Sequence, residues 1–222
     1  LRTRVSLCAL GGYGRAQMNP CSDLDISLVY EGTLNDQIGA LDEYLVPFLW
    51  DAGFRVGFAV RSMDESLELA RRDTAVLTSL LEGRHVVGDS TVFGRLKLLL
   101  REQMRGPSLE TFVEQKLFDR TAGLPPQYRD LYTAEPNIKE NAGGLRDYHT
   151  ALWLLMMLYD VNTLEEAVSQ GLLTADEHLD FVKGLDFLLR VRNEMHFSAG
   201  KPQDDLLFAN QRRICEAFGY SE

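Results

Sequence analysis

The sequence predicts an α+β domain followed by an all-helical domain. Strand and helix patterns alternate through the first half of the chain, whereas no strand-like run follows Gly106-Pro107. The 222 residues are enough for two small domains. We therefore expect one domain over residues 1–106 and a helical bundle over residues 107–222.

The first domain has three clear strand patterns and one short one. In residues 24–30 apolar and polar side chains alternate, so Leu24, Ile26 and Leu28 are expected in the core. Ser62 followed by Glu65 is a capping box, and Asp89 is a candidate helix cap. The expected strands are 4–10, 24–30, 55–60 and the edge strand 85–87, and the expected helices cover 36–51, a short segment after Ser62, 73–81 and a segment after Asp89.

The second domain is expected to contain helices over residues 108–120, 144–159, 163–169, 175–197 and 209–218. Residues 122–143 are rich in Pro, Gly and Asn, which indicates a long ordered loop. Residues 144–159 are apolar nearly all round, so this helix is expected to be buried, with the run that begins at Trp153 in the core.

Composition and charge exclude several classes of protein. Acidic residues outnumber Lys and Arg by 33 to 23, and the net charge of −10 argues against general nucleic-acid binding. The three cysteines form no CxxC or Cys/His pattern, so we expect reduced thiols in a cytoplasmic protein. No apolar run approaches the ~18 residues of a membrane span, so no membrane association is expected.

The most informative pattern is a glycine turn followed by paired acids. Residues 11–14 read Gly-Gly-Tyr-Gly, Arg15 follows, and Ser22-Asp-Leu-Asp25 comes next. Alternate residues of a strand share a face, so Asp23 and Asp25 can together hold one or two hard cations. Glycines let the backbone approach phosphates, Arg15 can add a charged contact, and Ser22 caps or orients the acids. The pattern favours metal-assisted attack on a nucleoside triphosphate, and the alternative is a plain turn with solvated acids.

These motifs resemble a known superfamily. Residues 10–15 with residues 22–26 are similar to the DNA polymerase β-type nucleotidyltransferases. Later motifs narrow the resemblance to the bifunctional uridylyltransferase/uridylyl-removing enzymes of the GlnD family, which modify the PII signalling protein. These later motifs are Asp73 with 78–82 and Arg84, Glu135–Glu140, Gly143–Asp147, Asp204–Phe208, Gln211 and Gly219-Tyr220.

The resemblance implies a polymerase β-like nucleotidyltransferase domain followed by a helical domain. It also implies transfer of UMP from UTP to a tyrosine of PII, in nitrogen regulation, with Mg²⁺ or Mn²⁺. Asp23 and Asp25 would be the catalytic and metal-binding residues, and Gly11, Gly12, Tyr13, Gly14, Arg15 and Ser22 would bind nucleotide. The family continues into hydrolase and regulatory domains, so we expect a piece that lacks the uridylyl-removing activity.

The chain departs from the superfamily at the third acid that usually faces the first two. Gly57 and Ala59 occupy the face of strand 55–61 where this acid would lie. Asp73 and Glu82 are the nearest candidates, although a simpler interpretation is that Asp73 caps a helix and Glu82 lies on a helix surface. Two other functions therefore stay open, namely a non-catalytic nucleotide-binding or sensor module, and a related signalling nucleotidyltransferase that acts on another protein.

The helical domain has polar clusters of its own. Lys139 and Arg146 flank the helix start at Gly143-Gly144 and are candidates for binding the nucleotide phosphates. The alternative is a salt-bridge corner in which Arg146 pairs with Glu140. The histidines His149, His178 and His196 are expected to be packed or at the surface, and the polar helix face of Arg190, Arg192 and Asn193 is expected to be solvated.

Overall fold

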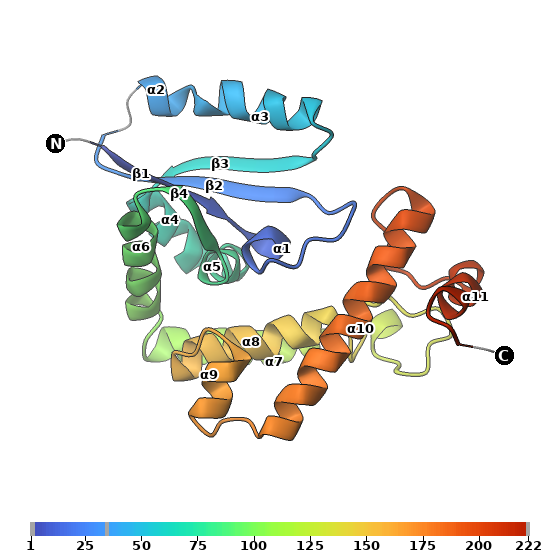
Figure 1. Ribbon diagram of the computed structural model, residues 1–222. Coiled ribbons are helices and arrows are strands. Elements are labelled where there is room, and N and C mark those ends of the chain that lie inside the picture. Colours follow the sequence, from blue (N-terminus) through green and yellow to red (C-terminus); the bar gives the residue numbers. More distant parts are fainter. Residues whose placement is uncertain (1–2, 34–35, 221–222) are drawn as a thin grey trace. The chain divides into compact units, whose positions relative to one another are not determined.

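The computed structural model describes residues 3–33 and 36–220 (Figure 1). The chain divides into two compact units. Unit 1 contains the described residues up to Met18 and from Ser22 to Ser108, and unit 2 contains Asn19–Cys21 and the described residues from Leu109. The sequence placed one boundary at 106/107 and did not predict that residues 19–21 belong with the helical unit.

Unit 1 is built on a four-stranded mixed sheet with the strand order β3-β2-β1-β4. The central strand β1 is antiparallel to both β2 and β4, and β3 is parallel to β2. The short strand predicted around His85 is confirmed as an edge strand of this sheet. The strands are β1 (Arg4–Ala9), β2 (Leu24–Glu31), β3 (Val56–Ser62) and β4 (Arg84–Gly88).

The helices of unit 1 begin largely where the capping residues predicted. Ser62 and Glu65 form the reciprocal capping box, and Asp89 accepts a hydrogen bond from the Thr91 amide. The glycine turn forms a single helical turn, and the helix predicted over 36–51 is divided in two. The helices are α1 (Gly11–Gly14), α2 (Asp36–Gly39), α3 (Leu41–Asp51), α4 (Met63–Arg72), α5 (Thr74–Leu81) and α6 (Ser90–Gln103).

Both faces of β2 are covered, which corrects the expected one-sided burial. Ile26 and Leu28 are buried as predicted, but Ser27 and Val29 on the opposite face are buried as well. The reason is that helices lie on both sides of the sheet, with α2 and α3 on one side and α4 to α6 on the other (Figure 1). Asp25 shares the face of Ser27 and Val29, because alternate residues of a strand point the same way.

The second half of the chain is helical, as predicted, and in the described residues it contains no strand beyond an isolated bridge between Asn137 and Asp205. Ile138, Val191, Met195 and Ile214 form a buried apolar cluster in unit 2. The elements are α7 (Pro107–Arg120), the 3₁₀ turn η1 (Pro126–Tyr128), α8 (Leu145–Tyr159), α9 (Leu164–Ser169), α10 (Ala175–Ala199) and α11 (Phe208–Ala217).

Helix α8 is not buried along its whole length, contrary to the prediction. Trp153 is buried, but Leu158 and Tyr159 are 44% and 50% exposed. At this end of α8 an apolar cavity of about 240 Å³ lies between α8 and residues of α9 and α10, with Phe181 on its wall. Apolar residues on every side of this helix therefore did not ensure that the whole helix is buried.

None of the helices in the described part of the chain has the length and hydropathy needed to cross a membrane.

Candidate active site

The end of β1 brings the glycine segment beside Asp25. The Leu10 amide, just after β1, donates a hydrogen bond of 2.8 Å to the backbone oxygen of Asp25. Gly11 follows with a φ of +52°, and a Cβ there would lie 3.0 Å from Asp25 Oδ2. Only glycine suits this position, because it tolerates the positive φ and leaves room for the carboxylate.

A second glycine borders the same carboxylate from β3. Gly57 is the register partner of Asp25 in the parallel pair β2/β3. A Cβ at Gly57 would lie 2.7 Å from Asp25 Oδ1, closer than real Cβ contacts come. The Asp25 carboxylate therefore lies between two backbone segments without side chains, and a side chain at position 57, such as the third acid that the resemblance implied, would require the Asp25 carboxylate to move.

Of the two acids predicted from the sequence, Asp23 affects the ionisation of Asp25. The pKa of Asp25 is raised above its ordinary value, first by partial burial and second by the negative charge of Asp23, while the charge of Arg15 acts in the opposite direction. Asp23 lies just before β2 and is exposed. Its Oδ1 atom forms an ion pair with Arg55 Nε at 3.0 Å. A bound cation would relieve the repulsion between the two carboxylates.

Arg15 and Glu82 are more closely engaged than the sequence predicted. The Arg15 guanidinium forms an ion pair with Glu82 and donates a bond of 3.1 Å to Gln17. The Glu82 side chain is only 4% exposed, so the expectation of a helix surface residue is wrong. The expected helix cap at Asp73 is present, since its carboxylate accepts from the Ala75 amide at 2.7 Å.

The three glycines of α1 have different surroundings. A Cβ at Gly14 would lie 2.9 Å from the Ala9 carbonyl oxygen, so this glycine allows close backbone packing. At Gly12 the nearest atoms would be at ordinary contact distance, 3.5 Å or more. The Tyr13 carbonyl accepts from Arg84, whose guanidinium also lies 5.3 Å from the centre of the Tyr13 ring. Ser22 is partly buried directly before Asp23.

No group of three or more His, Cys, Asp or Glu side chains suited to a metal ion occurs within residues 3–33 and 36–220. Asp23 and Asp25 are thus a pair, and neither Asp73 nor Glu82 joins them in such a group.

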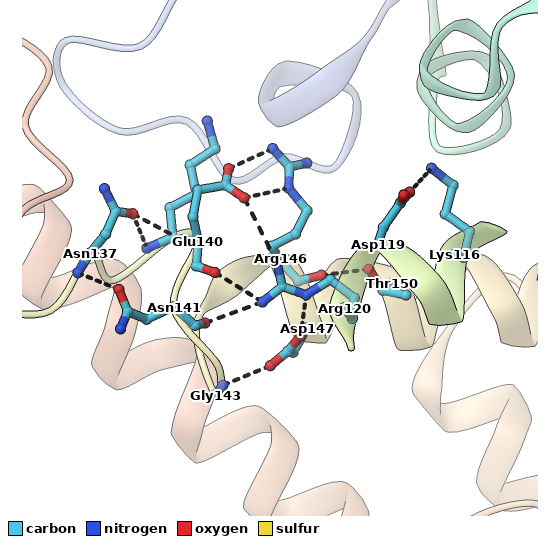
Figure 2. Close-up of polar contacts among 11 residues, drawn as sticks. Lys116, Asp119, Arg120, Asn137, Glu140, Asn141, Gly143, Arg146, Asp147 and Thr150 are labelled. Carbon is cyan, nitrogen blue, oxygen red and sulfur yellow. Dashed lines mark hydrogen bonds and ion pairs between the residues drawn. The ribbon is translucent and has the colours of Figure 1, made fainter. Parts of the chain in front are cut away.

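In unit 2 the loop before α8 is held by Arg120, a residue the sequence analysis did not single out (Figure 2). Its guanidinium pairs with Asp147 and donates to the Glu140 and Asn141 carbonyls at 3.0 and 3.3 Å. Arg146 donates to Glu140 at 3.0 Å, so the predicted salt-bridge corner is present. No local spacing indicates Arg120, because its partners lie 20 and more residues away.

Lys139 lies in the same corner and is partly withdrawn from water. Its pKa is lowered, first by burial and second by the positive charge of Arg146, whereas Asp204 and Glu140 act in the opposite direction. A negative charge placed next to Lys139 would stabilise its charged form, which burial and Arg146 disfavour. This environment is compatible with phosphate binding by Lys139, which stays a prediction.

A separate cavity of about 550 Å³ lies between α8 and α10. Gly143, Asp147 and Tyr148 line it, together with Asp180 and Phe181 of α10. Neither Lys139 nor Arg146 is among its lining residues.

One polar face of α10 is packed rather than solvated, which corrects the expectation for Arg192 and Asn193. Arg192 pairs with Asp204 at 2.7 Å and donates to Asn19 at 2.6 Å, and Asn193 accepts from Asn19 at 2.7 Å. His196 is fully buried, in agreement with a packed role, and His149 is buried as well. The only local signal in residues 19–21 is the Asn19-Pro20 dipeptide, which indicates a turn and does not indicate contact with α10.

Comparison with known proteins places the chain in a family. Residues 111–222, half of the chain, match the sequence model of the GlnD PII-uridylyltransferase family. The chain belongs to this family. The resemblance of the sequence motifs to the GlnD family is therefore confirmed.

Relatives in the GlnD family match the chain over almost its full length. Bifunctional uridylyltransferase/uridylyl-removing enzymes of Phenylobacterium zucineum and Rhodospirillum rubrum are each 37% identical to it, over 99% of the chain. The enzyme of the same name from Caulobacter vibrioides is 34% identical, also over 99% of the chain. The chain spans 23% of the length of each of these three relatives.

Proposed function

We propose that this chain is a polymerase β-like nucleotidyltransferase that transfers UMP from UTP to a tyrosine hydroxyl of PII. The observation that carries the proposal is the Asp25 carboxylate between Gly11 and Gly57, with Asp23 close enough to raise its pKa. The names of the relatives support the uridylyl group as the one transferred.

The side chains at Asp23 and Asp25 fit a divalent cation. Carboxylate oxygens are the donors that Mg²⁺ and Mn²⁺ prefer, and Mg²⁺ commonly takes one or two carboxylates and completes its shell with substrate phosphates and water. A pair without a third acid therefore has enough donors when UTP is present. The raised pKa of Asp25 is consistent with an acid pair that a cation would stabilise in its charged form.

When bound, the cation would neutralise charge on the phosphates and on the leaving pyrophosphate. Asp23 and Asp25 would orient the triphosphate through it, and the α1 backbone at Gly12 leaves space for the phosphates to approach. The tyrosine hydroxyl gives its proton to water, its oxygen forms the new bond to the α-phosphorus, and the bond to pyrophosphate breaks. Arg15 acts on this site through its charge next to Asp25, since its guanidinium is held by Glu82.

The alternative of a nucleotide-binding module without transfer activity has one observation in its favour. Asp23 already pairs with Arg55, and in the described residues no third acid accompanies the two aspartates. Such a module would bind UTP with Mg²⁺ and would transfer nothing to any acceptor.

A transfer assay with labelled ATP, CTP, GTP and UTP in parallel, with PII as acceptor, tests the proposal. We expect label on PII from UTP in the presence of Mg²⁺ or Mn²⁺, and none on a PII variant whose acceptor tyrosine is replaced by phenylalanine. Binding of UTP without any transfer would instead support the module.

Two sets of variants show whether the acid pair is responsible. Asp23→Asn and Asp25→Asn should each abolish transfer, because each removes a charged oxygen donor. Asp51→Asn is the matched control, since Asp51 ends α3 in the same unit and is exposed. Unchanged transfer in either of the first two variants contradicts the assignment of the site.

A further inference from the structure

Residues 19–21 form part of unit 2 although unit 1 lies on both sides of them in the sequence. Asn19 is only 3% exposed. Its side-chain oxygen accepts a bond of 2.6 Å from Arg192 Nη1, and its side-chain nitrogen donates to Asn193 at 2.7 Å. This asparagine is therefore bound on both sides of its amide by consecutive residues of α10.

Arg192 is held in place by a second partner. Its Nε and Nη2 atoms donate to the two carboxylate oxygens of Asp204 at 2.7 and 3.4 Å, and both side chains are largely buried. Two parallel bonds from a guanidinium to a carboxylate give orientation as well as energy. The backbone oxygen of Asp204 accepts from the Ile138 amide at 2.8 Å, which ties this acid to the loop before Lys139.

Cys21 gives a further anchor. Its amide donates to Nδ1 of the fully buried His196 at 3.3 Å. A ring nitrogen that accepts carries no proton, so this bond assigns the His196 proton to Nε2, which lies 4.0 Å from Asp204 Oδ1. Asp204 thus lies next to both Arg192 and His196, two α10 side chains that hold residues 19–21.

The anchored segment leads directly to the acid pair. Asp23 is two residues beyond Cys21 and one residue before β2, where the Leu24 amide donates to the Arg55 carbonyl oxygen at 2.7 Å. Its side chain is 61% exposed, and Arg55 is its ion-pair partner. Asp25 is placed by the sheet, whereas Asp23 lies between the end of the sheet and the segment that α10 holds.

We propose that Arg192, supported by Asp204, is a positioning residue that fixes Asn19 and thereby orients Asp23 relative to Asp25. The proposal rests on the proposed function, because it concerns the same acid pair. It assigns to α10 a part in the geometry of the metal site that does not involve contact with the substrate.

The test compares Arg192→Gln and Asn19→Ala with Arg190→Gln in the 222-residue chain. Asn19→Ala leaves the Arg192–Asp204 pair in place, so it separates loss of the anchor from loss of a buried ion pair. Arg190 is the matched control, since it lies on the same helix and is exposed; it pairs with Asp186 at 3.8 Å and lies 4.5 Å from the centre of the Phe218 ring, and neither contact involves residues 19–21.

The first measurement is amide hydrogen exchange in peptides that cover residues 19–25, which needs neither nucleotide nor activity. We expect faster exchange in Arg192→Gln and Asn19→Ala and no change in Arg190→Gln, with β1 and β3 protected as in the wild type. Unchanged exchange at Cys21 and Ser22 in both variants overturns the proposal.

The second measurement separates positioning from a purely structural role. Both variants should lower kcat for UMP transfer about 10- to 100-fold while KM for UTP changes little, since a misplacement of about 1 Å at a reacting centre has that effect. The affinity for Mn²⁺, measured by electron paramagnetic resonance without nucleotide, should fall in parallel. Faster exchange with wild-type kcat and Mn²⁺ affinity overturns the proposal.

Failure of the proposed function gives a different pattern. If the wild type binds Mn²⁺ but transfers nothing, the transferase proposal fails, and loss of Mn²⁺ affinity in Asn19→Ala still supports positioning of the pair. If the wild type binds no Mn²⁺ and transfers nothing, both proposals are overturned.

Discussion

Asp25 shows how backbone geometry prepares one side chain for its chemistry. Gly11 and Gly57 approach its two carboxylate oxygens, and partial burial together with Asp23 raises its pKa. The folded state therefore binds a proton at Asp25 more tightly than the unfolded chain does. It follows that this group lowers the free energy of unfolding as the pH rises above the ordinary pKa of an aspartate.

Asp25→Asn should accordingly leave the metal-free protein at least as stable as the wild type at neutral pH. The difference in the free energy of unfolding should narrow as the pH falls and should be smallest below the ordinary aspartate pKa of about 3.9, where the wild-type group becomes protonated in both states. Thermal unfolding of both proteins across this pH range is the measurement.

Mn²⁺ provides the companion experiment. The cation should raise the melting temperature of the wild type and have little effect on Asp25→Asn, because only the folded state with both carboxylates binds it. A large loss of stability in the metal-free variant at neutral pH would point to a structural role for Asp25 instead.

At the scale of elements, α1 combines positions that must remain glycine with one that can accept a side chain. Gly11 borders Asp25 and Gly14 packs on the Ala9 carbonyl, whereas Gly12 has ordinary contacts only. This difference makes Gly12 the position at which phosphate binding can be tested without disturbing the sheet.

Gly12→Val should fold and lose affinity for UTP with Mg²⁺, because the branched side chain would occupy the space through which the phosphates approach. Calorimetric titration measures the affinity, and circular dichroism checks the fold. Gly14→Ala is the comparison, and we expect it to destabilise unit 1, since its Cβ would lie 2.9 Å from a backbone oxygen. Wild-type UTP affinity in a folded Gly12→Val would exclude α1 as the phosphate-binding segment.

At the scale of the whole molecule, the net charge of −10 opposes the approach of an anionic nucleotide. Binding must therefore depend on local positive groups. Lys139 and Arg146 are such groups, and burial together with Arg146 lowers the pKa of Lys139. A phosphate next to Lys139 would favour its charged form and raise that pKa.

Lys139→Ala and Arg146→Ala should each weaken UTP binding about ten- to hundredfold, the scale of about 1.5–3 kcal/mol for a hydrogen bond to a charged group. Wild type should also take up a proton on binding UTP at alkaline pH, and Lys139→Ala should not. Titration calorimetry in two buffers of different ionisation enthalpy detects that proton.

Lys183→Ala is the control for this pair, because Lys183 is exposed on α10. Normal UTP binding by both Lys139→Ala and Arg146→Ala would contradict their assignment as phosphate-binding residues. The Arg146–Glu140 pair would then act only to hold the loop before α8.

The sequence by itself determined the features that depend on neighbouring residues. The capping box at Ser62, the cap at Asp89 and the strand that places Asp25 after the glycine segment all follow from local spacing, and the structure contains them. The family was also recognisable from short motifs. These features could be predicted because hydrogen bonds between near neighbours decide them.

Only the tertiary structure decided which distant groups meet. Arg15 and Glu82 are 67 residues apart, and Asn19 and Arg192 are 173 apart, so no spacing rule indicates either pair. The same holds for Gly57 beside Asp25, which follows from the parallel register of β2 and β3. The physical reason is that burial and charge pairing depend on how the strands and helices pack, whereas local patterns determine only where these elements begin and end.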